Sequence, residues 1–88
     1  MSIHVLFFGK LADMAEAELG STSLTVEDNL KYKTVNELIN HLEQLSSALA
    51  TDIHQVGTLY AVNQTLCQPD SAITAGDEVA FMSPLSGG

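Results

Sequence analysis

Two apolar segments, one at each end of the chain, constrain the fold more than any other feature. Residues 3–8 are β-branched, aromatic or aliphatic apart from one histidine, and Gly9 follows them, which predicts a strand. Residues 78–82 come after the turn sequence of residues 75–77 and predict a closing strand. Strongly apolar strands suit the centre of a sheet. If these two are parallel neighbours, the chain between them is the crossover connection.

The crossover contains two helical patterns. Residues 10–19 predict a short helix that stops at Gly20. Residues 34–45 form the clearer pattern, because Thr34 and Glu37 make a capping box. Apolar residues of this second helix repeat on one stripe at Val35, Leu38, Ile39, Leu42 and Leu45. Residues 46–57 are less readable and could form one more helical turn or a packed loop.

Three more short strands are expected. Residues 21–26 predict a strand antiparallel to the first, and residues 59–62 and 65–67 predict a pair around the turn residues Asn63-Gln64. This order of elements indicates an α+β domain over residues 1–82, with a mixed sheet and one main helix packed on one sheet face. Its core is expected to contain Val5, Phe7, Val35, Leu38, Ile39, Leu42, Val79 and Phe81.

Alternation places the other side chains of the two end strands on the outer face of the sheet. His4, Leu6 and Phe8 share that face in the first strand, and Ala80 and Met82 share it in the last. Leu6 and Phe8 are therefore a candidate contact patch, because exposed apolar clusters mark interaction surfaces more often than single residues do. In the alternative, Phe8 and Met82 only cover the sheet under a loop.

Charge and composition exclude several classes of function. The net charge of −8, with no arginine, argues against nucleic acid as a partner, because nothing could neutralise a row of phosphates. No apolar run approaches the ~18–20 residues that span a membrane. A single cysteine permits no internal disulfide, and the start of the chain lacks the pattern of a signal peptide. A cytoplasmic location is expected.

No self-contained catalytic site is recognisable. His4, His41 and His54 lack the spacing of metal ligands, so no metal is expected. Cys67 has neither a second cysteine nor a basic neighbour in the sequence to activate its thiol. Glycine loops for phosphate and nucleophile motifs are also missing from the sequence.

The last six residues, 83–88, are the remaining candidate site. Gly87 and Gly88 have no side chains and could thread a narrow tunnel, while Pro84 ends the strand and stiffens the start of this tail. Six residues reach at most about 20 Å. We expect a tail that is mobile in the free domain and presents its carboxylate to another protein's active site. After adenylation, a sulfur nucleophile would give a thiocarboxylate and an amine would give a conjugate. The plainer alternative is a frayed end.

Four short motifs, in their order and spacing, resemble the small, sulfur-carrier subunit of molybdopterin synthase. They are Val5-Leu6-Phe7-Phe8-Gly9-Lys10, Ala61-Val62-Asn63-Gln64, Gly76-Asp77-Glu78-Val79-Ala80-Phe81 and the terminal Gly87-Gly88. The resemblance runs from residue 3 to the end of the chain and implies the ubiquitin-like β-grasp fold. Ser83 stands where this family often has the first of two prolines, which implies a looser tail.

The resemblance also implies a route for sulfur. An E1-like enzyme would adenylate Gly88 with ATP, sulfur transfer would make the thiocarboxylate, and Gly87 would permit passage into the large synthase subunit. That subunit would hold the catalytic side chains and deliver the sulfur to cyclic pyranopterin monophosphate. The chain would then be the non-catalytic, sulfur-donating part of a heterotetramer, with no permanently bound cofactor. Its implied contacts with partners are Phe8, Leu66, Met82, Pro84, Leu85 and Ser86.

Three other functions remain open from the sequence. A thiamine-pathway sulfur carrier is the nearest, although such carriers are usually shorter. A ubiquitin-like modifier would end the same way, so only the product, a thiocarboxylate or an isopeptide, distinguishes it. A plain interaction module would be indifferent to the loss of Gly88.

Overall fold

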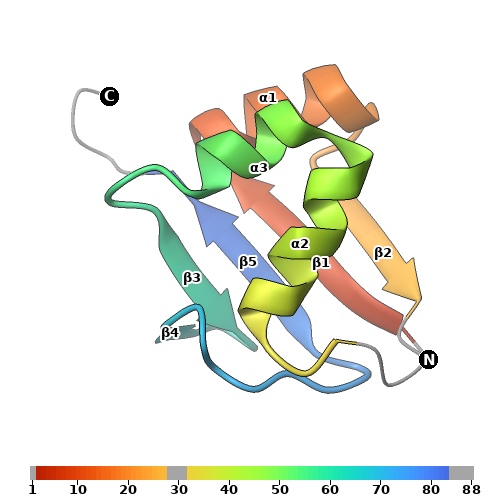
Figure 1. Ribbon diagram of the computed structural model, residues 1–88, viewed down its shortest axis with the longest axis vertical. Coiled ribbons are helices and arrows are strands. Elements are labelled where there is room, and N and C mark those ends of the chain that lie inside the picture. The colour runs from red at the N-terminus through yellow and green to blue at the C-terminus, as the bar shows by residue number, and fades with distance from the viewer. Residues whose placement is uncertain (1, 28–31, 84–88) are drawn as a thin grey trace.

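The computed structural model describes residues 2–27 and 32–83, which form a five-stranded sheet with helices packed on it (Figure 1). The helices are α1 (Lys10–Leu19), α2 (Val35–Leu45) and α3 (Ser47–Ile53). The strands are β1 (Ser2–Phe8), β2 (Ser23–Glu27), β3 (Leu59–Val62), β4 (Thr65–Cys67) and β5 (Glu78–Met82), in the spatial order β2-β1-β5-β3-β4.

The two end strands are neighbours inside the sheet, as the sequence predicts. β1 and β5 run parallel, with Val5 opposite Val79 and Phe7 opposite Phe81. The remaining pairs, β1 with β2, β5 with β3 and β3 with β4, are antiparallel. The sheet is therefore mixed, with the crossover helix packed on it, and the expected α+β β-grasp fold is confirmed.

Helix α2 begins where the capping pattern predicts. Thr34 Oγ1 accepts a hydrogen bond from the Glu37 amide at 3.2 Å, and the Glu37 carboxylate accepts one from the Lys33 amide at 2.6 Å. Two backbone donors at the helix start are thus satisfied. Four of the five stripe residues are buried, as expected for Val35, Leu38, Ile39 and Leu42, whereas the fifth, Leu45, is 48% exposed. Leu45 is the last residue of α2. The chain turns at Ser46, and after this turn the core is covered by α3.

Ser46 joins three helices at one point. It ends α2 and is the N-cap of α3, where its Oγ accepts a hydrogen bond from the Leu49 amide at 3.1 Å. The same hydroxyl donates to Glu18 Oε1 of α1 at 2.6 Å. Leu49 and Ile53 of α3 are fully buried. Of the two interpretations left open for residues 46–57, the helical one is correct.

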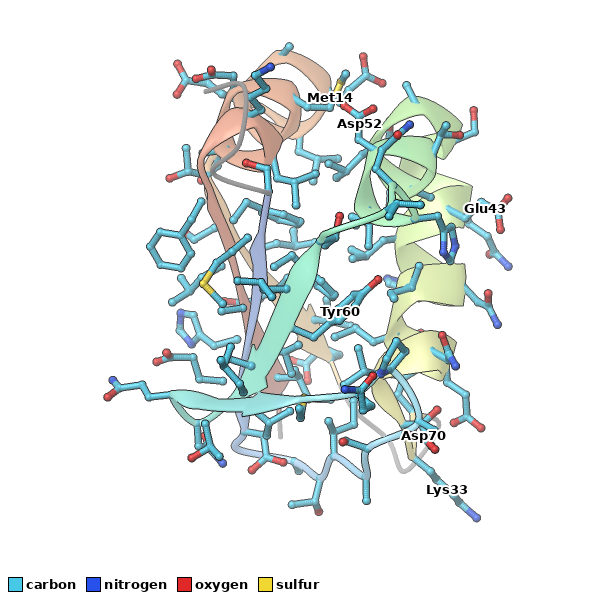
Figure 2. All side chains as sticks on the ribbon, turned by 90° about the vertical axis from the view of Figure 1, so that its left-hand side faces the viewer. Met14, Lys33, Glu43, Asp52, Tyr60 and Asp70 are labelled. Carbon is cyan, nitrogen blue, oxygen red and sulfur yellow. The ribbon has the colours of Figure 1, made fainter. Side chains whose placement is uncertain are left out.

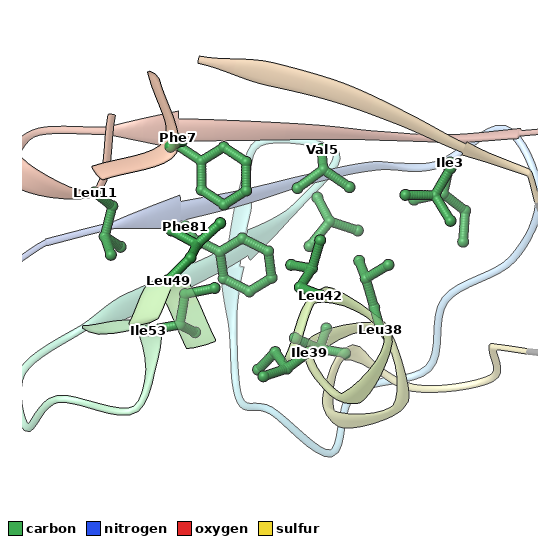
Figure 3. Close-up of a cluster of buried hydrophobic side chains, with 14 of the residues drawn as sticks. Ile3, Val5, Phe7, Leu11, Leu38, Ile39, Leu42, Leu49, Ile53 and Phe81 are labelled. Carbon is green, nitrogen blue, oxygen red and sulfur yellow. The ribbon is translucent and has the colours of Figure 1, made fainter. Parts of the chain in front are cut away.

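The core lies between one face of the sheet and the helices. The rings of Phe7 and Phe81 stack with centroids 5.8 Å apart, and Figure 3 shows both side chains pointing from the strands toward α2 and α3. Tyr60 meets Phe81 edge-on at 5.9 Å, and in Figure 2 it extends from β3 toward the helices. The eight predicted core residues are all buried here: Val5, Phe7, Val35, Leu38, Ile39, Leu42, Val79 and Phe81. No helix among the described residues covers the opposite face.

Candidate functional site

The face of the sheet turned away from the helices carries an apolar surface. β-pairing puts Phe8 opposite Met82 and Met82 opposite Leu59, so these side chains form one row across three strands. The next row crosses four strands, from Leu6 through two alanines to Leu66. We call these seven residues the outer patch: Leu6, Phe8, Leu59, Ala61, Leu66, Ala80 and Met82.

Three large side chains of the outer patch are exposed, two others, Leu6 and Met82, are partly buried, and the two small ones are buried. Phe8 is 48% exposed, Leu59 46% and Leu66 64%, whereas Ala61 and Ala80 are covered. An open hollow of about 480 Å³ lies over the alanines, because these are the smallest residues of the patch. Phe8 and Leu66 line this hollow, and the exposed Leu59 lies opposite Met82, which also lines it. An exposed apolar surface of this kind has the character of a protein contact site.

Polar residues bound the outer patch on the side away from the end of β5. The next row of the same face contains Thr25, His4 and Glu78, with His4 opposite both of the others. Glu78 and Gln64 also line the rim of the hollow. The apolar part of the face is therefore concentrated at the end of the sheet where β5 finishes and the chain continues toward its C-terminus.

Three of the predicted contact residues lie together on this surface: Phe8 and Met82, which alternation placed on the outer face, and Leu66, which the resemblance implied. Their role in binding a partner stays a prediction. The described residues include no loop over Phe8, so the alternative of a merely covered sheet finds no support there. The other predicted site residues lie outside the described part of the chain: Pro84, Leu85, Ser86, Gly87 and Gly88.

Leu59 is a member of the outer patch that the sequence analysis missed. It lies opposite Met82, and its side chain is as exposed as that of Phe8. The signal in the sequence was the two-residue turn Asn63-Gln64. In the structure these residues have positive φ angles of 51° and 69°, and this turn fixes the register of the β3–β4 hairpin. Once Leu66 is placed on the outer face, alternation along β3 assigns Leu59 to the same face.

Ser83, the last described residue, is tied to the start of α1. Its Oγ accepts a hydrogen bond from the Lys10 amide at 2.7 Å, and its amide and hydroxyl both donate to the Phe8 carbonyl at 3.4 Å. The looser tail implied by serine in place of proline concerns residues that lie outside the described part of the chain, and it stays a prediction. A small polar side chain holds the root of the tail by hydrogen bonds instead of by ring stiffness.

Other candidate chemistry is weak in residues 2–27 and 32–83. In that part of the chain no three His, Cys, Asp or Glu side chains are grouped as metal ligands would be. Cys67 is a free, partly buried thiol. His41 accepts or donates a hydrogen bond at Nδ1 with the Tyr32 hydroxyl at 2.8 Å. The helices within these residues are too short or too polar to cross a membrane.

Known proteins match the chain over nearly its whole length. The model of the ThiS family matches residues 5–88. Two proteins named molybdopterin synthase sulfur carrier subunit, from Haemophilus influenzae and Escherichia coli, are 33% and 35% identical to the chain over 86 residues. Each alignment covers 98% of this chain and 99% of the relative.

Solved structures match the fold. SAMP1 from Haloferax volcanii, a small archaeal modifier protein, superposes with a TM-score of 0.80 at 26% identity, over the whole of both chains. A complex of subunits 1 and 2 of molybdopterin-converting factor from Helicobacter pylori contains a chain that matches with a TM-score of 0.63 at 18% identity, again over both whole chains. That second similarity is one of fold.

Proposed function

Because the chain belongs to the ThiS family, we propose that it is the sulfur-carrier subunit of a molybdopterin synthase. The observation that carries this proposal is the full-length similarity to two proteins of that name, at 33% and 35% identity. The family match extends to the last residue and so includes Gly87 and Gly88. The part of the molecule that would react is the terminal carboxylate, and the domain would carry and direct it.

The chemistry begins with activation of that carboxylate, because a free carboxylate is a poor electrophile. In the proposed route an E1-like enzyme transfers AMP from ATP to the Gly88 carboxylate and releases pyrophosphate. A sulfide-level donor then attacks the Gly88 carbonyl carbon, the bond to the AMP oxygen breaks, and AMP leaves. The product is a thiocarboxylate whose sulfur is a nucleophile. ATP and sulfur pass through this route, and neither is a resident cofactor of the domain.

The large synthase subunit is the proposed second partner. A model for such a pairing is the Helicobacter pylori complex of subunits 1 and 2, in which one chain has the fold of this protein. The outer patch suits such docking, because exposed apolar anchors supply most of the affinity at protein interfaces. The net charge of −8 would speed the approach to a basic partner surface. Sulfur transfer to cyclic pyranopterin monophosphate would then use catalytic side chains of the large subunit.

A second candidate function is conjugation to other proteins. The similarity to the small archaeal modifier protein SAMP1, with a TM-score of 0.80 and 26% identity, favours it. Activation of Gly88 would be the same, but a lysine amine would displace AMP and form an isopeptide bond. The two functions therefore differ in the nucleophile and share the first step.

The mass of the product tests both functions together. The purified chain is incubated with ATP, sulfide and its activating enzyme, and its intact mass is measured. Replacement of one oxygen by sulfur at the C-terminus is the expected result. A chain linked to lysines of other proteins, with no sulfur incorporated, would favour the modifier. No ATP-dependent change in mass would contradict both.

A further inference from the structure

The β1–β5 ladder ends at the pair Phe8 and Met82, one residue before Ser83. Beyond Phe8 the chain turns away from the sheet through Gly9, whose φ of 66° and ψ of −139° break the strand, and enters α1. Ser83 therefore has no continuing β1 strand to pair with. Its hydroxyl and amide make hydrogen bonds to the turn itself, to the Lys10 amide at 2.7 Å and the Phe8 carbonyl at 3.4 Å.

Ser83 supplies what the start of α1 lacks. The first amides of a helix have no partner inside the helix, and a side chain at the N-cap usually accepts from one of them. The N-cap of α1 is Gly9, which has no side chain and makes no such bond. The Ser83 hydroxyl, 73 positions along the chain, accepts from the Lys10 amide in its place. The beginning of α1 and the root of the tail are thus one hydrogen-bonded unit.

Gly9 keeps the space that Ser83 needs. A Cβ atom at position 9 would overlap the Ser83 Oγ, whereas the Ser83 Cβ and amide nitrogen would be at ordinary contact distance from it. The positive φ of Gly9 disfavours other residues as well. The backbone conformation therefore favours glycine at this turn, and any side chain there would displace the Ser83 hydroxyl from its place.

We propose that Ser83 is a positioning residue for the tail, an inference that rests on the proposed function of the tail as the sulfur carrier. Its hydroxyl fixes the position of Ser83, the residue from which the tail starts, beside Phe8 and Met82 of the outer patch. Five residues reach at most about 17 Å. Because this reach is short, the fixed position of Ser83 limits the volume that the terminal carboxylate can occupy once the outer patch has docked. Anchoring lowers the entropic cost of placing the carboxylate in a partner's active site.

Three variants test whether the Ser83 hydroxyl positions the tail. Ser83→Ala removes the hydroxyl, Ser83→Thr retains it, and Gly9→Ala leaves Ser83 in the sequence but fills its space. For each variant we would measure kcat/KM for adenylation by the activating enzyme and the Kd for the large subunit. For Ser83→Ala and Gly9→Ala we expect kcat/KM to fall and Kd to rise, each by about three- to tenfold, as for the loss of one hydrogen bond. Ser83→Thr should stay within about twofold of wild type, because the acceptor oxygen is kept.

The decisive control is the same comparison in chains that end at Ser83. All the core residues precede this position, so the shortened chain keeps the whole core. Without a tail to direct, Ser83→Ala should no longer change the Kd for the large subunit. An equal loss in the shortened and full-length chains would overturn the inference, because Ser83 would then act only on the docking surface. An unchanged full-length Ser83→Ala protein would overturn it too.

Hydrogen exchange in the free protein tests the anchor without any partner. The Lys10 amide should exchange about tenfold faster in Ser83→Ala than in wild type and at nearly the wild-type rate in Ser83→Thr. Equal Lys10 exchange in all three proteins would contradict the anchor itself. A wild-type chain that is neither adenylated nor bound would instead contradict the proposed function, and this inference with it, before any variant is compared.

Discussion

Phe8 and Met82 lie opposite each other on the parallel β1–β5 ladder, on the outer face and at its last paired position. Phe8 is 48% exposed, and its sequence neighbour Phe7 is 3% exposed. The two phenylalanines therefore have opposite environments although they are adjacent in the sequence. On β5 the contrast is smaller, because Met82 is partly buried while Phe81 is fully buried. Under the proposed function, binding and folding would depend on alternate residues of the same strands.

Substitutions of these neighbours should separate the two properties. Phe8→Ala or Met82→Ala should weaken large-subunit binding by roughly 1–3 kcal/mol, as expected for an interface anchor. Phe7→Ala or Phe81→Ala should instead lower the free energy of unfolding by about 3–5 kcal/mol, because each leaves a cavity in the core. Calorimetric binding and urea unfolding of all four variants check this. If Phe8→Ala unfolds the domain while Phe7→Ala only loses binding, the face assignment is reversed.

Leu59 extends the prediction to a residue found only in the structure. Leu59→Ala should weaken binding of the large subunit by about 1–2 kcal/mol, since Leu59 stands beside Met82 in the outer patch. The matched control is Leu45→Ala, because Leu45 is 48% and Leu59 46% exposed while Leu45 ends a helix on the other side of the sheet. Its effect on binding should stay below about 0.3 kcal/mol. Equal effects of the two variants would argue against the outer patch as the interface.

The capping box of α2 should contribute measurably to stability. Thr34→Ala removes the acceptor for the Glu37 amide, and we expect the free energy of unfolding to fall by about 1 kcal/mol. Thr51→Ala serves as the control, because the Thr51 hydroxyl donates only to the Ser47 carbonyl on an exposed helix surface. Urea unfolding should find the control within about 0.5 kcal/mol of wild type. Equal losses in the two variants would mean that the cap adds nothing.

Tyr60 should make the fold sensitive to alkaline pH. Burial raises the pKa of the Tyr60 phenol above its usual value of 10.0, because the anion is disfavoured next to the core. Well below pH 10 the phenol is neutral in both the folded and unfolded states, so it does not make the free energy of unfolding depend on pH. As the pH rises above 10, the unfolded phenol ionises first and stability falls. Tyr60→Phe should flatten this part of a plot of unfolding free energy against pH, and an unchanged slope would contradict the assignment.

Local patterns predicted the framework of the fold because each pattern is complete within a short segment. The capping box and stripe of α2 need only residues 34–42, and alternation along residues 3–8 and 78–82 assigns the faces of the central strands. Helix α3 was left open between a helical turn and a loop because Leu49 and Ile53 give too few repeats in seven residues to establish a helical period. Leu45 fits the period, but periodicity alone does not reveal where the core ends.

The site was predictable to a smaller extent, for a related reason. Alternation brought Phe8 and Met82 together, and the same rule applied along β3 would have added Leu59. The anchoring of Ser83 had no signal of this kind. Its hydroxyl meets the Lys10 amide across 73 positions, and only the paired ends of β1 and β5 bring the two together. Contacts of this type depend on the assembled sheet and leave no pattern in either segment.

Deletion of Gly88 tests the central claim, that the chain carries sulfur on its terminal carboxylate. Gly88 has no side chain to bury, so we expect its deletion to change the free energy of unfolding by no more than about 0.5 kcal/mol. The measurement is the transfer of isotopically labelled sulfur to cyclic pyranopterin monophosphate, with ATP, the activating enzyme and the large subunit present. The account predicts labelled product with the full chain and none with the chain that lacks Gly88. Labelled product in equal amounts from both chains would contradict it.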